Sequence, residues 1–201
     1  MKNLLLGCVA MAALIGQAQA YTISQSSTLP GGPYTSPIPD SSTPDVFTDR
    51  TTSDPGVYKS PFEGTSAYGS LFTSIEGNGT ATFNATGNQL SLIWGSPDTY
   101  NQLSFYSGAN AGGDLLGTVT GSSINPANGT GFSYVTIGGL DTFGSFKLIN
   151  NPGTNAFEVS TFNVSSVPLP AGLPMFGGAL LCLGGLALLR RGRKAVAAAA
   201  V

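Results

Sequence analysis

The chain has no histidine, only two cysteines and few charged residues. The absence of histidine excludes Ser-His-Asp and Cys-His catalysis and histidine-based zinc or iron sites. Cys8 and Cys182 lie in the apolar ends of the chain, so residues 21–167 hold neither a disulfide nor a thiolate. The main catalytic chemistry that remains possible is that of two carboxylates that flank a bond, as in glycosidases. We predict a non-catalytic protein with no metal and no cofactor.

Basic residues are scarce between residues 21 and 167. This part has three of them against ten acidic residues, a formal charge of −7. A nucleic-acid or anionic-membrane surface requires a basic patch that releases counterions. The body of the chain is therefore predicted to have no nucleic-acid partner.

Residues 1–20 have the form of an export signal. A positive charge precedes the apolar stretch 4–15, and a small-x-small motif ends at Ala20. We predict cleavage between Ala20 and Tyr21. The alternative is a lipoprotein signal that ends before Cys8, but the apolar stretch before that cysteine is too short.

The C-terminal part has the layout of a membrane anchor. Residues 171–189 carry no charge, and as a helix they would cover roughly 28 Å, close to the ~30 Å hydrocarbon core of a bilayer. One interpretation is a transmembrane helix that is held by a cytoplasmic basic cluster of Arg190, Arg191, Arg193 and Lys194. Five glycines and Pro174 weaken this helix, which favours a processed signal over a permanent anchor.

The tail opens with a short Pro-x-Pro element that consists of Val167, Pro168, Leu169, Pro170 and Ala171. Together with the apolar span and the basic cluster, this element resembles the VPLPA variant of the PEP-CTERM sorting tail. The commoner form has Glu at the position of Leu169, and residues 195–201 extend past the usual end. The resemblance implies a bacterial protein exported to the cell envelope or cell surface. Its tail is expected to be handled by an exosortase-type enzyme.

Residues 21–66 are predicted to form an arm or long loop on the surface. Seven of the thirteen prolines lie between residues 29 and 61, and proline cannot support the hydrogen-bond ladder of a central strand. Four aspartates here could supply oxygen ligands to Ca²⁺, although their spacing matches no EF-hand. Solvated loop acids are the favoured interpretation of Asp40, Asp45, Asp49 and Asp54.

Residues 67–166 predict an all-β fold, an antiparallel β-sandwich. Short β-rich runs are separated by Gly, Asn and Pro at 68–75, 80–84, 89–94, 102–106, 115–120, 132–137, 145–149 and 156–164. Alternation along these runs gives a predicted core. Its members are Leu90, Leu92, Leu103, Leu148 and Val159, with the aromatics Phe83, Trp94, Phe105, Phe132, Phe146 and Phe157.

Two short runs, 94–101 and 155–159, also resemble elements common among exosortase-sorted surface proteins. This resemblance implies a jelly-roll-like form of the sandwich and implies no activity.

Four residues are candidates for a ligand surface: Trp94, Asp98, Tyr100 and Glu158. Sugar-binding surfaces often combine an aromatic ring with a carboxylate. The favoured alternative is that Trp94 belongs to the core, that Asp98 caps a turn and that Glu158 points to solvent.

Three functional hypotheses follow. The first is a non-catalytic surface or matrix protein, and the second is a carbohydrate-binding module with polysaccharide as its partner. The second requires Trp94, or a row of Tyr100, Tyr106 and Tyr134, to be exposed. The third is a glycan-active enzyme, which requires two carboxylates roughly 5–9.5 Å apart in a cleft.

Overall fold

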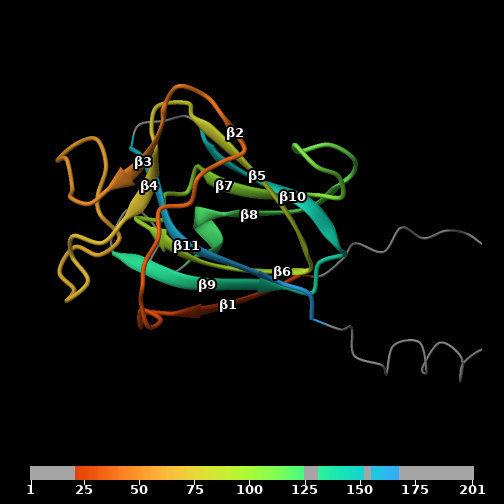
Figure 1. The fold of residues 1–201 in the computed structure, drawn as a ribbon, viewed down its shortest axis with the longest axis horizontal. Helices are drawn as coiled ribbons and strands as arrows, with labels where there is room; N and C mark the ends of the chain where they lie inside the picture. Colours follow the sequence, from red (N-terminus) through yellow and green to blue (C-terminus); the bar gives the residue numbers. More distant parts are fainter. Residues whose placement is uncertain (1–20, 125–130, 152–154, 168–201) are drawn as a thin grey trace, which may run out of the picture.

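The computed structural model describes residues 21–124, 131–151 and 155–167, which form two packed antiparallel sheets (Figure 1). The first sheet has the strand order β1 (Thr22–Ser26), β9 (Phe132–Gly138), β6 (Gln89–Gly95), β11 (Phe157–Ser165), β4 (Phe72–Ile75) and β3 (Val46–Arg50). The second has the order β2 (Ser41–Ser42), β5 (Thr80–Gly87), β10 (Phe143–Asn150), β7 (Asn101–Tyr106) and β8 (Leu115–Thr120). A single 3-10 turn, η1 (Gly121–Ser123), follows β8. The prediction of an all-β sandwich is confirmed.

The core lies between the inner faces of the two sheets. Alternate residues of each strand point inward, because successive side chains of a strand face opposite sides of its sheet. The members predicted from this alternation are buried: Phe83, Leu90, Leu92, Trp94, Leu103, Phe105, Phe146, Leu148, Phe157 and Val159. Phe132 is the exception, because it is only partly buried and packs on the outer side of the first sheet.

The segment 21–66 is more than the arm or long surface loop that its prolines predict. It supplies three strands, and each of them lies at a sheet edge: β1 beside β9, β3 beside β4 and β2 beside β5. An edge strand pairs on one side only, so proline-rich flanks do not prevent it from joining a sheet. The sandwich therefore begins at Thr22 and not at Ala67.

The rest of this segment covers the outer face of the first sheet. Thr35 exchanges hydrogen bonds with Thr161 of β11, and the Tyr34 ring packs 4.8 Å from that of Phe62. Phe62 is fully buried with Phe72 and Ile93 in a second apolar cluster. The segment thus forms a cover over β4, β6 and β11, and the loops from residue 50 to 71 gather beside β3 and β4 (Figure 1).

The predicted signal peptide and all of the predicted tail after Val167 lie outside the described residues. Within the ranges that the structure describes, no helix has the length and apolarity needed to cross a bilayer. At the two ends of the sandwich the chain is fixed by side chains. The Tyr21 hydroxyl donates to the Thr118 carbonyl at 2.6 Å, and the Asn88 side chain bonds both the N–H and the carbonyl of Val167.

Candidate functional site

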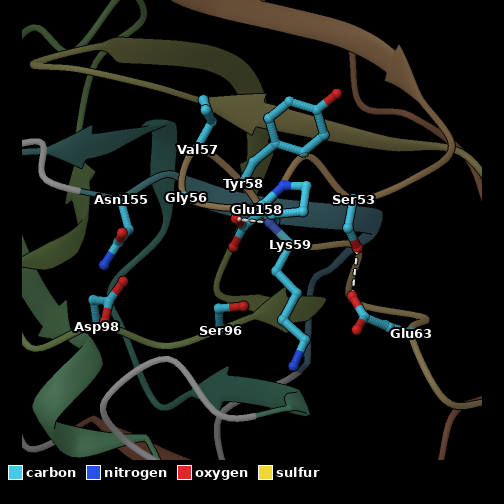
Figure 2. A pocket seen from close by; sticks show the side chains of 11 residues that line it. Ser53, Gly56, Val57, Tyr58, Lys59, Glu63, Ser96, Asp98, Asn155 and Glu158 are labelled. Carbon is cyan, nitrogen blue, oxygen red and sulfur yellow. Dashed lines mark hydrogen bonds between the residues drawn. The ribbon is translucent and has the colours of Figure 1, made fainter.

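A pocket of about 380 Å³, lined by both polar and apolar atoms, lies between the cover and the ends of β6 and β11 (Figure 2). This volume falls in the ~300–1,000 Å³ range of small-molecule sites. The cover contributes Ser53, Pro55, Gly56, Val57, Tyr58, Lys59 and Glu63, and the sheet side contributes Ser96, Asp98, Asn155 and Glu158. In Figure 2, Asp98 and Asn155 lie together on one side of the pocket, and Ser53 and Glu63 lie on the other.

Glu158 enters this site because of its position on β11. Its neighbours Phe157 and Val159 point into the core, so Glu158 points to the outer face beneath the cover. The backbone N–H of Lys59 donates to Glu158 Oε1 at 2.8 Å. Across the sheet, Glu158 pairs with Gly95, where a Cβ atom would lie only 2.9 Å from Cβ of Pro61. A glycine at this position therefore lets the cover close over the carboxyl group.

The electrostatic surroundings of Glu158 disfavour a charge. The side chain is 1% exposed, and this burial raises the pKa of Glu158 well above its ordinary value. The Lys59 amide opposes the shift, whereas the negative charge of Asp98 adds to it. The prediction that Glu158 points to solvent is therefore wrong, because the cover shields it.

Asp98 is held in the loop between β6 and β7. Its N–H donates to Asn101 Oδ1 at 2.9 Å, and the Tyr100 hydroxyl donates to its Oδ2 at 2.9 Å. The Asn155 N–H in turn donates to the Tyr100 oxygen at 3.0 Å. Burial raises the pKa of Asp98, and the hydrogen bonds from Tyr100 and Asn155 partly oppose the shift. The network links Asp98 to the start of β11.

Two residues that line the pocket each have a buried polar side-chain atom with no hydrogen-bond partner within the part of the chain that the structure describes. These atoms are Glu158 Oε2 and Ser96 Oγ. The Ser96 hydroxyl lies near enough to oppose slightly the rise in the pKa of Glu158, but the two groups do not meet hydrogen-bond geometry. Ser96 has a φ of 40°, in the left-handed region, and its N–H donates to the Gly131 carbonyl. A strained turn thus holds an unpartnered hydroxyl near the carboxyl group of Glu158.

Trp94 does not contribute to a ligand surface. Its ring is fully buried and stacks on Phe157 with ring centroids 4.5 Å apart. The tyrosine row is also not formed, because Tyr106 ends β7 in one sheet and Tyr134 lies on β9 in the other. Tyr100 is half-buried, and its hydroxyl donates a hydrogen bond to Asp98. Of the four candidates, the structure places only Asp98 and Glu158 on the pocket.

No local sequence pattern indicates the part of the site that the cover supplies. Tyr58, for example, stacks on the Arg50 guanidinium 4.5 Å away, an arrangement set by the tertiary fold. Ser96 and Asn155 belong to the two runs already singled out, 94–101 and 155–159, so a place for them near the acids Asp98 and Glu158 could have been suspected. The position of Lys59 above Glu158 could not have been suspected, because the two residues are 99 positions apart in the sequence.

The aspartates of residues 40–54 form no evident calcium site. Asp40 accepts the Asn84 N–H at 2.7 Å, and Asp54 closes a tight turn with Tyr58. Among the described residues, no three His, Cys, Asp or Glu side chains are grouped as metal ligands.

Comparisons with known proteins add little. No protein-family model matches the chain, and a search of curated proteins found no significant match. A solved structure of a β-1,3-glucan-binding CBM6 from Bacillus halodurans is similar at a TM-score of 0.40 and 14% identity, covering 73% of this chain and 96% of that one. The class defined by fold and site is an all-β sandwich with a covered, acidic pocket.

Proposed function

We propose that the protein is an exported, non-catalytic surface protein whose pocket binds a sugar residue of a polysaccharide. The observation that carries this proposal is a pair of unpartnered buried atoms, Glu158 Oε2 and Ser96 Oγ, which belong to two residues that line the pocket. A buried polar atom without a partner costs about 1–3 kcal/mol, and a ligand that bonds to it recovers that cost. A sugar hydroxyl both donates and accepts, so it can serve a carboxyl and a hydroxyl together.

The other wall residues fit the same class of ligand. Asn155 offers an amide, and Lys59 offers an ammonium group that extends along the pocket in Figure 2. Tyr58 provides an aromatic side chain at the edge of the pocket. Small-molecule sites combine apolar walls with a few such placed polar groups.

A glycan array tests this proposal. The full chain is expected to bind one class of glycan, and Ser96→Ala and Glu158→Ala are expected to lose at least tenfold in affinity. Ser122→Ala, on the exposed side of η1, is the matched control and should bind normally. If no glycan binds, or if Ser96→Ala binds like the control, the proposal fails.

A glycan-active enzyme is the second candidate, because one observation favours it. Asp98 and Glu158 share a pocket, and burial raises the pKa of both. A carboxyl that stays protonated can give its proton to a leaving oxygen, while a second carboxylate assists. Release of reducing ends that is lost in both Asp98→Asn and Glu158→Gln would favour the enzyme over the binding protein.

We also propose that the chain is exported, cleaved before Tyr21 and sorted through its VPLPA-type tail by an exosortase-type enzyme. The contacts of Tyr21 and Val167 are compatible with this, since each is fixed to the sandwich by side-chain hydrogen bonds. Intact-mass measurement of the cell-associated protein is the test. We expect a chain that begins at Tyr21 and lacks Arg190 and the residues after it. A mature chain that retains them would leave a plain membrane anchor.

A further inference from the structure

We propose that Glu158 meets the ligand as a neutral carboxylic acid, which donates a hydrogen bond from Oε2 to an oxygen atom of an uncharged glycan. This inference rests on the proposed function. It specifies the class of ligand and the direction of the hydrogen bond at Glu158, which is less exposed than Ser96 and Asp98 of the same site.

The first support is the geometry of the carboxyl group. Glu158 is 1% exposed, and its Oε1 accepts the Lys59 N–H at 2.8 Å. Oε2 has no partner among the described residues. A neutral carboxyl has one accepting oxygen and one hydroxyl that donates. Oε1 already accepts a hydrogen bond, so in the neutral carboxyl group Oε2 is the oxygen that carries the proton. The Oε2 hydroxyl can then donate a hydrogen bond to the ligand.

The second support is the lack of a countercharge from the cover and from the β6–β7 loop. From the cover, Lys59 faces Glu158 with its backbone, and its ammonium group forms no ion pair in the described part of the chain. Glu63, also from the cover, is acidic and accepts the Ser53 hydroxyl. From the β6–β7 loop, Asp98 is acidic and acts on Glu158 by repulsion. An isolated buried carboxylate is very costly, so the group is expected to remain neutral.

The two strands that pair with β11, β4 and β6, contain no basic residue. The guanidinium of Arg50, on β3 beside β4, pairs with Glu76 at 3.1 Å. The same guanidinium lies over the Tyr58 ring, 4.5 Å from its centroid. Arg50 is thus committed to other groups, and burial without compensation raises the pKa of Glu158.

The surrounding acids also select the ligand. Asp98, Glu63 and an acidic body outnumber the single Lys59 ammonium of the pocket, and their net effect would disfavour an anionic sugar such as a uronate. A cationic amino sugar would bind best to an ionised Glu158, whereas the proposed Glu158 is neutral. An uncharged glycan bound by a protonated Glu158 should bind more weakly by about tenfold per pH unit above the pKa of that carboxyl.

Infrared spectroscopy tests the protonation without any ligand. The full chain in detergent is compared with Glu158→Gln, and with Asp114→Asn as a control at an exposed acid outside the pocket. Near neutral pH, the wild-type-minus-Gln difference spectrum should contain the C=O stretch of a protonated carboxylic acid. The Asp114→Asn difference should contain carboxylate bands. Carboxylate bands at Glu158 would overturn the inference, whatever the protein binds.

Binding then tests the hydrogen bond, with neutral glucan and xylan oligosaccharides, alginate oligosaccharides and chitosan oligosaccharides as probes. We expect a neutral probe to bind, Glu158→Gln to keep its affinity within about threefold without pH dependence, and Glu158→Ala to lose at least tenfold. Glutamine keeps the shape and a donor at this position. A folded Glu158→Gln that loses tenfold, or preferred binding of chitosan or alginate, would overturn the inference while leaving sugar binding intact. Binding of none of the probes, with the acid band present, would instead reject the proposed function.

Discussion

Trp94→Ala is expected to destabilise the sandwich and to leave no specific mark on ligand binding. The indole is fully buried in the core and stacks on Phe157. Truncation of a buried tryptophan to alanine costs ~3–5 kcal/mol. The indole Nε1 has no hydrogen-bond partner among the described residues, so removing it returns about 1 kcal/mol. The expected net loss is about 2–4 kcal/mol of unfolding free energy, or roughly 4–16 °C in Tm.

The assay is thermal unfolding followed by circular dichroism, because the variant has no other tryptophan to report by fluorescence. Trp94→Phe is the matched control. It keeps an aromatic ring against Phe157 and removes the unpartnered N–H, so its loss should stay within about 1.5 kcal/mol. In the wild-type chain, the single tryptophan should resist quenching by acrylamide.

The contrary result is clear. A Trp94→Ala protein that loses less than about 1 kcal/mol, yet no longer binds a glycan that the wild type binds, would place the ring at the surface. It would also restore Trp94 as a stacking platform for sugars and contradict the burial on which the pocket hypothesis depends.

Three further predictions concern the pocket and its support. Gly95→Ala should lower stability by about 1–3 kcal/mol and weaken ligand binding, because the new Cβ would lie 2.9 Å from Cβ of Pro61 and lift the cover; equilibrium urea unfolding with a binding assay measures both. Asn150→Ala should cost about 2–4 kcal/mol by the same unfolding assay, since this fully buried amide donates to two carbonyl oxygens at 2.9 and 2.7 Å. The folded-state pKa of Glu158 is raised, so the folded chain binds more protons than the unfolded chain. Wild-type stability should therefore fall as the pH rises from the ordinary pKa of a glutamate toward the raised pKa of the folded state; Tm measured against pH should fall less in Glu158→Gln.

The strands were predictable from sequence because their signal is local. Alternation of apolar and polar residues, bounded by turn residues, gives both the existence of a strand and the face that it buries. The expected runs 89–94 and 115–120 correspond to β6 at Gln89–Gly95 and β8 at Leu115–Thr120. Edge strands β1 and β3 were missed because their partners are distant and their flanks are rich in proline.

The site was predictable only in part. The acids Asp98 and Glu158 stood out by residue type, and they do line one pocket. Their protonation state depends on burial beneath the cover, and no local pattern reports that residues 53–63 fold over β11. The same lack of long-range information explains the error for Glu158. On a strand with one face in the core, the other face is expected to be in solvent, unless a third layer covers it.

The register between β6 and β11 specifies the core and the pocket at once. Val159 lies opposite Trp94, and Glu158 lies opposite Gly95. Slipping β11 by one residue would exchange the two faces, placing the Glu158 carboxyl in the core and the Phe157 ring beneath the cover. The stack of Trp94 on Phe157 opposes that slip, because it is formed only in the observed register. A contact on the inner face of the sheet therefore positions the carboxyl group on its outer face. This gives a physical reason why the runs 94–101 and 155–159, far apart in sequence, act as one structural unit.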